Sequence, residues 1–316
     1  MSKVTFVSIV YDEEAALLGL QAASLSKFFY DKDISSIIVI VNQENFESFS
    51  KKFYSKTIFY YGNLLSKVTL LDAGCLFPYG AGKYDRNPGY YKQQICKLYA
   101  AKIVKDDHYI CLDAKNFFVA PASAEDFFYN SIPNSYFELY KSDPPSIQRM
   151  GSAEYSKFFG IADLENHEPG MAIMTPFAFH KDIVLDLIKF FELAGNPIES
   201  KFSSFTRRSE FLLYFTYMRY KKIDFSSRYC VTRTPLSKTF WPDQNFSRRS
   251  FFNSIKSMNE KNQKIVGLHK NTLVNSNVEE IFCLRKYLID IGISQEACDD
   301  FYIFASEIIR GSVAGL

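Results

Sequence analysis

The sequence predicts an α/β fold in which helices flank a mostly parallel central sheet, followed by a helical C-terminal extension. Two observations support this prediction. Short apolar runs rich in β-branched residues alternate with helical patterns, and the first three runs are followed by Asp12, Asn42 and Asp72. Buried runs that alternate with helices are typical of a parallel sheet covered on both faces, and ligands bind at the carboxyl ends of such strands. We therefore expect these polar side chains at a ligand-binding edge.

The spacing of apolar residues places the individual elements. Residues 3–10 alternate as a strand, and the acidic residues that follow favour the start of a helix. The other predicted strands cover residues 35–41, 67–71, 108–113, 171–174 and 264–268. The predicted helices cover residues 14–30, 43–55, 91–105, 181–194, 207–221, 278–291 and 294–309. Because no internal repeat or low-complexity linker divides the chain, we predict one main domain over 1–270 with a helical extension over 271–316 packed on it.

Composition excludes several classes of protein. The net charge is +2, from 37 Lys and Arg against 35 Asp and Glu, which is not the basic signature of a dedicated nucleic-acid binder. The six cysteines are scattered and form no C-x-x-C pair, so we expect reduced thiols in the cytoplasm. No apolar run approaches the ~20 residues that cross a bilayer, so we expect at most a peripheral membrane contact. Aromatic residues reach 17%, and they can belong either to the core or to a ligand cleft.

Residues 89–121 combine an amphipathic helix, a buried strand that ends at Asp113, and a short aromatic run followed by Pro121. This stretch resembles the central segment of nucleotide-sugar glycosyltransferases of the GT-A architecture, including glycogenin-like and bacterial lipopolysaccharide enzymes, in which the strand ends in an Asp-x-Asp motif. The Tyr-x-Gln-Gln helix, the Asp-x-Lys-Asn strand end and a Ser-Glu-Phe-x-x-Tyr helix are also similar to those of proteins encoded with bacterial capsule and lipopolysaccharide genes.

The resemblance implies a GT-A-like (Rossmann-like) catalytic domain over 1–270. Its implied activity is a glycosyltransferase that moves a hexosyl or related sugar from a nucleotide-sugar donor to a bacterial surface glycan or glycolipid, at the inner face of the membrane. The alternative is a catalytically silent module of the same fold that binds a sugar nucleotide or a glycan. A nucleotidyltransferase is disfavoured, because no Gly-rich phosphate-binding signature lies near the first strand.

Lys115 stands where the resemblance places the second carboxylate of the Asp-x-Asp motif. That carboxylate holds Mn²⁺ or Mg²⁺ against the donor diphosphate, whereas an ammonium can itself stabilise a departing phosphate as a fixed positive charge. The second possibility is a metal at Asp113, with Asn116 and His269 as further ligands, because the resemblance places a metal-binding His near the end of the catalytic domain. Mn²⁺ or Mg²⁺ is thus a conditional cofactor, and no other is predicted.

Glu210 is the first candidate for the base that takes the proton of the acceptor hydroxyl. It shares a predicted helix face with Tyr214 and Tyr217, and a half-buried carboxylate among rings has a raised pKa. Glu168 is the second candidate. The structural alternatives are a first-turn Glu210 favoured by the helix dipole and an Asp113 that only caps its loop.

Other residues that the resemblance assigns to the donor follow the first two strands or lie on the helix before Asp113. They are Tyr11, Asp12, Asn42, Tyr91, Gln93, Gln94 and Lys97. Five cations are open alternatives for the diphosphate: Arg207, Arg208, Arg233, Lys238 and Lys270. Five tyrosines are expected at the cleft: Tyr11, Tyr90, Tyr91, Tyr214 and Tyr217. The Gly- and Pro-rich loop at 72–90 is long enough to be functional.

The last predicted helix carries an apolar stripe of Cys298, Phe301, Tyr302, Ala305, Ile308 and Ile309. Such a stripe usually packs against the rest of the domain. The alternative is a peripheral contact with the membrane.

Overall fold

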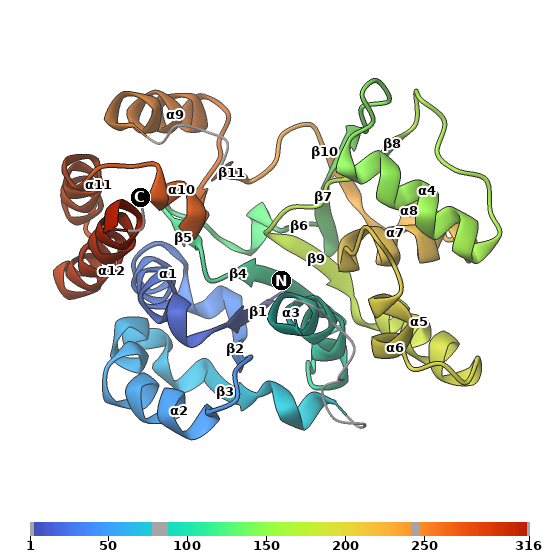
Figure 1. Cartoon of the computed structure of the whole chain (residues 1–316), viewed down its shortest axis with the longest axis horizontal. Coiled ribbons are helices and arrows are strands. Elements are labelled where there is room, and N and C mark those ends of the chain that lie inside the picture. The colour runs from blue at the N-terminus through green and yellow to red at the C-terminus, as the bar shows by residue number, and fades with distance from the viewer. Residues whose placement is uncertain (1–2, 78–87, 242–246, 315–316) are drawn as a thin grey trace.

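The computed structural model describes residues 3–77, 88–241 and 247–314 and has the predicted α/β architecture (Figure 1). Its central sheet has five strands in the order β3-β2-β1-β4-β9. They are β3 (Val68–Asp72), β2 (Ile34–Val41), β1 (Val4–Val10), β4 (His108–Asp113) and β9 (Phe177–His180). β1, β2, β3 and β4 are parallel and only β9 runs antiparallel, so the prediction of a mostly parallel sheet is confirmed.

Helices between and after these strands cover the two faces of the sheet, as the apolar strands require. They are α1 (Ala15–Phe28), α2 (Phe46–Ser55), α3 (Pro88–Tyr99), α5 (Lys181–Leu193) and α7 (Glu210–Tyr220). Neighbouring residues of β4 face opposite sides of the sheet. Tyr109 faces α3, because its hydroxyl donates to the Lys97 carbonyl (2.8 Å), and Asp113 lies on the same side of the strand as Tyr109.

Two smaller sheets complete the architecture. One has the order β10-β7-β6 with β8 beside β7, and its strands are β6 (Phe128–Tyr129), β7 (Ile132–Leu139), β8 (Pro169–Met171) and β10 (Cys230–Thr232). The other consists of β11 (Ser237–Phe240), β12 (Ile265–Leu268) and β5 (Asn116–Phe118). β12 runs antiparallel to β5, and the Leu268 N–H donates to the Lys115 carbonyl (3.0 Å), which brings the following His269 near the end of β4.

The strand predicted at 171–174 is wrong in its bounds. Only Met171 belongs to β8, because Ala172 donates one further hydrogen bond to Tyr136 and the chain then leaves the sheet. The strand that pairs with β4 is β9, which the sequence did not indicate. The remaining helices are α4 (Ile147–Phe159), α6 (Ile198–Ser203), α8 (Phe225–Arg228), α9 (Arg248–Glu260), α10 (Lys270–Val274), α11 (Val278–Asp290) and α12 (Gln295–Ala314).

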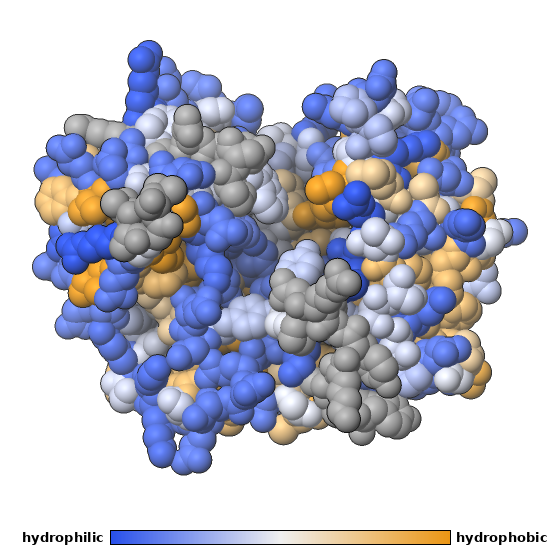
Figure 2. Space-filling view, in the orientation of Figure 1, coloured by the Kyte–Doolittle hydropathy of each residue, from blue (hydrophilic) through white to orange (hydrophobic). Residues whose placement is uncertain are grey.

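The C-terminal helices pack on the main domain. Cys298, Phe301 and Ala305 of α12 are fully buried and belong to the main core, and α12 lies along α1 (Figure 1). The apolar stripe of this helix is therefore mainly a packing surface. Within the described part of the chain, no helix has both the length and the apolar character needed to span a membrane. In the view of Figure 2 the outline is notched at the top, between the lobe that carries α9 and α11 and the lobe that carries α4.

The buried His180 makes the stability depend on pH. Its Nε2 donates to the Arg228 carbonyl (2.7 Å) and its ring lies 4.4 Å from that of His108. Burial lowers the pKa of His180 to about 4 from 6.5, while the Arg228 carbonyl opposes the shift and His108 adds to it. Between these values the unfolded chain binds the proton more readily than the folded chain does, so stability falls as pH drops. We expect the free energy of unfolding to lose about 2 kcal/mol between pH 8 and pH 5 through this residue.

Urea unfolding of the wild type and of His180→Gln at several pH values measures this contribution. The loss between pH 8 and pH 5 should be smaller in the variant, because glutamine does not titrate. An equal pH dependence in both proteins would exclude His180 as its source.

Candidate active site

The end of β4 places Asp113 between two lysines. Its Oδ1 lies 2.9 Å from Lys97 Nζ, and its Oδ2 forms an ion pair with Lys115 and accepts a hydrogen bond from Thr175 Oγ1 (3.1 Å). Burial raises the pKa of Asp113, but the charges of Lys115 and Lys97 outweigh burial and hold that pKa well below its usual range. Asp113 is therefore a carboxylate with both oxygens engaged.

Gln21 of α1 holds the turn between β4 and β5 through hydrogen bonds. The amide of Gln21 donates to the carbonyls of Asp113 (2.7 Å) and Asn116 (3.1 Å), and Ser8 Oγ donates to Gln21 Oε1 (2.8 Å). Asn116 Oδ1 accepts from the Asp113 N–H (2.8 Å), and the Asn116 side chain is fully buried. These hydrogen bonds fix the strand end, so Lys115 projects from a rigid turn.

Lys97 also binds Glu210, which makes a buried ionic triad with Asp113. Lys97 Nζ lies 2.8 Å from Glu210 Oε1, and the two side chains are only 4% and 1% exposed. Burial raises the pKa of Glu210, and Lys97 partly opposes the shift. Burial lowers the pKa of Lys97, but Asp113 and Glu210 raise it well above its ordinary value. Lys97 is therefore held as a cation beneath the strand end.

Glu210 is the first residue of α7, whose N-cap is Ser209, and its N–H donates to Gln94 Oε1 (3.3 Å). The first-turn position that we considered as a structural alternative is thus present. The tyrosines expected beside Glu210 point elsewhere. Tyr214 and Tyr217 are buried, and their hydroxyls contact Tyr229 (2.7 Å) and Asp186 (2.8 Å), so their prediction as cleft residues is wrong.

Glu14 is a candidate that sequence reasoning missed. It precedes α1 at the carboxyl end of β1 and is partly exposed, although its Oε2 is buried and has no hydrogen-bond partner among the described residues. Burial and the charge of Asp113 raise its pKa, while Lys115 and Lys270 oppose the shift. Glu14 therefore places a second carboxylate near Lys115. The only signal in the sequence was its position in the acidic run after the first strand.

Thr175 and Gln21 were also missed, for a different reason. Both contact Asp113 through side chains that come from segments distant in the sequence, and neither belongs to a recognisable motif. Their role depends on tertiary packing that residue spacing does not reveal.

The residues at the strand end do not suit a divalent cation. A metal prefers free carboxylate oxygens, but both oxygens of Asp113 face ammonium groups at ion-pair distance. Asn116 Oδ1 is used within the turn, and His269 Nδ1 accepts from the Asn271 N–H (3.2 Å) as the cap of α10. Among the described residues, no three His, Cys, Asp or Glu side chains come together as a metal site.

Several residues predicted to hold the donor lie together at the carboxyl edge of the sheet. The Tyr11 hydroxyl and Asn42 Nδ2 (2.9 Å) both donate to the Gly89 carbonyl at the start of α3. Asp12 is exposed and pairs with Lys52 (3.2 Å). This edge also carries Lys270, which pairs with Glu13 (2.6 Å).

Besides Lys97, three donor candidates lie on α3. Gln93 is partly exposed, and Gln94 is buried against the start of α7. Tyr91 is buried with its ring 5.9 Å from that of Phe202, whereas Tyr90 is half exposed. The predicted loop at 72–90 lies partly outside the described residues.

The second-choice base and one candidate cation lie in other parts of the fold. The Glu168 carboxylate accepts from the Glu165 N–H (2.8 Å) within its own loop. Arg233 lines a cavity that is described below.

The fold is that of glycosyltransferases, as a comparison with solved structures indicates. The structure of WbbM, a bifunctional glycosyltransferase, matches 95% of this chain with a TM-score of 0.51 and 12% sequence identity. The match covers 51% of WbbM, so the chain spans about half of that protein's length. An active-site mutant of LgtC matches with a TM-score of 0.46 and 11% identity, over 84% of this chain and 87% of LgtC.

The chain belongs to DUF6492, a family of unknown function, whose model matches residues 8–252. The match includes Asp113, Lys115 and Glu210. No curated protein sequence is significantly similar to this chain.

Proposed function

We propose that this protein is a glycosyltransferase that moves a sugar from a nucleotide-sugar donor to a bacterial surface glycan, with Lys115 stabilising the leaving diphosphate. The observation that carries the proposal is the Lys115–Asp113 ion pair at the end of β4. In the reaction the bond between the anomeric carbon and the diphosphate oxygen breaks, and negative charge develops on that oxygen. A preorganised ammonium at this point lowers the barrier without a metal ion.

The charges around Lys115 favour this role. Lys97 Nζ contacts both Asp113 (2.9 Å) and Glu210 (2.8 Å), so Asp113 keeps a second cation when Lys115 meets a ligand. The Lys115 side chain is 15% exposed and can meet a ligand at the surface. Trp241, whose ring centre lies 5.9 Å from Lys115 Nζ, covers one side of the ammonium.

Two carboxylates with raised pKa values are candidates for the base. Glu210 was the choice from sequence, but its carboxylate is almost fully buried and faces Lys97. Glu14 is partly exposed and lies close enough to Asp113 and Lys115 for their charges to shift its pKa. A base must reach the hydroxyl that it deprotonates, so we infer that Glu14 receives the acceptor proton and Glu210 positions Lys97.

Comparison of Glu14→Gln with Glu210→Gln tests this assignment. We expect Glu14→Gln to lower kcat by about 10²-fold or more, with the wild-type melting temperature. Its loss should include the acidic limb of the pH profile, along which activity falls as the base is protonated. Glu210→Gln should instead change the melting temperature and leave that limb in place. A lost acidic limb in Glu210→Gln alone would assign the base to Glu210.

A thermal-shift screen of UDP, GDP, CMP and CDP sugars, each with Mn²⁺ or with EDTA, tests the proposed donor class. We expect at least one nucleotide sugar to raise the melting temperature equally in both conditions, because the positive charge comes from Lys115. The absence of a shift with every nucleotide sugar would contradict the proposal. A shift that requires Mn²⁺ would instead support a metal at Asp113.

Because the Glu210 carboxylate is buried, we also consider one other function, a binding module of the same fold that lacks turnover. Such a module binds the donor in the thermal-shift screen but releases no free nucleotide on incubation with donor and acceptor. Measurement of nucleotide release with the donor that shifts the melting temperature separates the two functions.

A further inference from the structure

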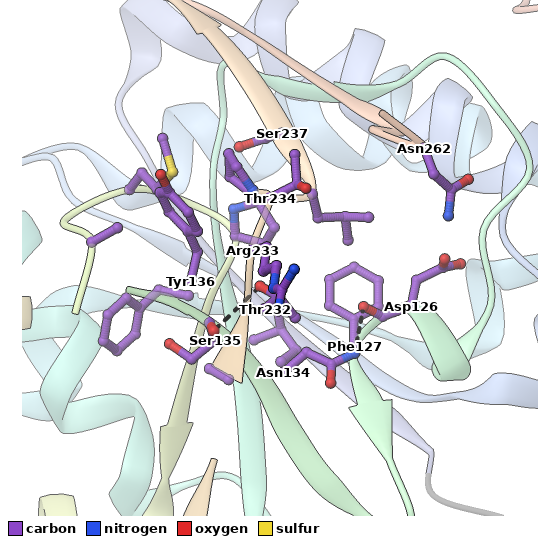
Figure 3. Close-up of a pocket in the computed structure, with 18 of the residues that line it drawn as sticks. Asp126, Phe127, Asn134, Ser135, Tyr136, Thr232, Arg233, Thr234, Ser237 and Asn262 are labelled. Atoms are coloured by element: carbon purple, nitrogen blue, oxygen red, sulfur yellow. Dashed lines mark hydrogen bonds between the residues drawn. The ribbon is translucent and has the colours of Figure 1, made fainter. Parts of the chain in front are cut away.

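A cavity lies on the side of β4 away from Asp113. It has a volume of about 310 Å³ and is lined by β7, β9, the segment between β10 and β11, and the turn before β12 (Figure 3). Ile110 of β4 lines it, and residues three apart on a strand face opposite sides of the sheet. The cavity is therefore separate from the strand end that carries Lys115. In Figure 1 the segment between β10 and β11 runs across the notch between the two lobes.

Two hydrogen bonds connect this cavity with the candidate active site. Ser237 lines the cavity, and its Oγ donates to the Thr175 carbonyl (2.7 Å). Thr175 Oγ1 in turn donates to Asp113 Oδ2 (3.1 Å). Thr175 thus contacts both Ser237 in the cavity lining and Asp113 at the candidate active site, so the two sites are neighbours in the fold.

The lining offers two cations whose side chains have no partner among the described residues. The side chains of Arg233 and Lys261 form no hydrogen bond or ion pair there, and both residues are exposed. Of the two acidic residues in the lining, Asp126 is already compensated, since it pairs with Lys264 (2.6 Å) and accepts from the Ser123 N–H (2.8 Å), and the exposed Glu125 is outnumbered by Arg233 and Lys261. An Arg guanidinium binds carboxylate and phosphate groups through two parallel hydrogen bonds. This side of the cavity therefore suits an anionic group.

The rest of the lining suits a sugar ring. Figure 3 shows the Phe127 ring and the Asn262 amide around the same open space as Arg233. The hydroxyls of Tyr136 and Thr234 have no partner among the described residues. Amide and hydroxyl groups beside an aromatic ring match the alternating polar and apolar faces of a saccharide. The volume is at the lower end of the ~300–1,000 Å³ that small-molecule sites span, which suits one or two sugar units.

We propose that this cavity binds an anionic sugar, one that carries a carboxylate or phosphate group, as a non-reacting unit of the acceptor glycan. Arg233 binds the anionic group, and Phe127, Tyr136 and Asn262 contact the ring. The assignment to the acceptor rests on the proposed glycosyltransferase function. The binding of an anionic sugar itself does not, because it depends only on the cavity.

The test is a titration of the full chain with glucuronate, glucose 6-phosphate, glucose and inorganic phosphate, followed by ligand-observed NMR without any nucleotide. We expect at least one of the two anionic sugars to bind about 10-fold or more tightly than glucose, because Arg233 adds a charge-assisted contact. Arg233→Gln should remove this preference, and Tyr136→Phe should weaken both the charged and the neutral sugar. Arg310→Gln is the matched control, since Arg310 is an exposed arginine of α12 outside the cavity.

Three outcomes would overturn the proposal. They are no binding of either anionic sugar, equal binding by the wild type and Arg233→Gln, and binding of inorganic phosphate as tight as that of glucose 6-phosphate. The last result would mean a site for a small anion only. Failure of this test is distinguishable from failure of the proposed function. The nucleotide-sugar screen tests donor binding at the strand end that carries Lys115, whereas this titration tests sugar binding in the cavity. Comparison of the carboxylate and phosphate sugars then identifies the anionic group.

Discussion

Replacement of Lys115 by alanine is expected to lower the rate of sugar transfer by about 10²–10³-fold while the fold remains intact. The variant loses the ammonium that meets the leaving diphosphate. Asp113 keeps Lys97 as a partner at 2.9 Å, so its carboxylate still faces one cation and the protein should fold with only a modest decrease in melting temperature. The measurement is the initial rate of nucleotide release with a donor that shifts the melting temperature, and circular dichroism checks the fold.

Two variants control this experiment. Lys115→Arg keeps the positive charge and should retain more activity than Lys115→Ala. Lys51→Ala removes an exposed lysine that pairs only with Glu47 on α2, and it should behave as the wild type. A wild-type rate in Lys115→Ala would refute the role of the ammonium, as would a wild-type enzyme that EDTA inactivates.

Replacement of Lys97 by methionine is expected to lower the free energy of unfolding by about 3–5 kcal/mol at neutral pH. The reason is that the variant leaves Asp113 and Glu210 buried without the cation between them, while methionine preserves most of the packing volume. The deficit should shrink as pH falls, because protonation of the two carboxyl groups then removes the uncompensated charge. Urea unfolding at pH 8 and pH 5 measures both effects.

Lys92 provides the matched control for Lys97. It lies on the same helix, α3, but is partly exposed and has no ion-pair partner among the described residues. Lys92→Met should change the free energy of unfolding by less than about 0.5 kcal/mol. The double variant Lys97→Met with Glu210→Gln should be more stable than Lys97→Met alone, because it removes the charge of Glu210, whereas Asp113 still pairs with Lys115. If Lys97→Met and Lys92→Met lower the free energy of unfolding by the same amount, the ion pairs of Lys97 with Asp113 and Glu210 do not stabilise the fold.

The sequence predicted the parallel sheet and the residues at its carboxyl edge because both depend on local patterns. Apolar runs identified β1, β2, β3 and β4, and strand ends located Tyr11, Asn42 and Asp113 without any tertiary information. The resemblance to glycosyltransferases, rather than the helical spacing, indicated Lys97, which the structure places against Asp113. Each of these residues lies within a few positions of the end of a strand or helix, and the apolar pattern of the sequence marks those ends.

The orientation of α7 could not be predicted in the same way. Its residues from Glu210 to Met218 are all buried, so the helix has no exposed face and the period of 3.6 residues does not distinguish a cleft side from a core side. The tyrosines of this helix consequently appeared to flank a cleft, whereas they pack in the core and their hydroxyls contact Tyr229 and Asp186. The role of Thr175 could not be predicted for another reason, since its contact with Asp113 joins two segments that share no local pattern.

The pairing of β5 with β12 has a consequence for how the protein is made. The Lys115 carbonyl receives its hydrogen bond from Leu268, far along the chain, so the strand-end turn is completed only after residue 268 has left the ribosome. Contacts between distant segments form late because closing the intervening loop costs entropy. A nascent chain that already has β1, β2 and β4 therefore still lacks the strand that packs beside the turn carrying Lys115.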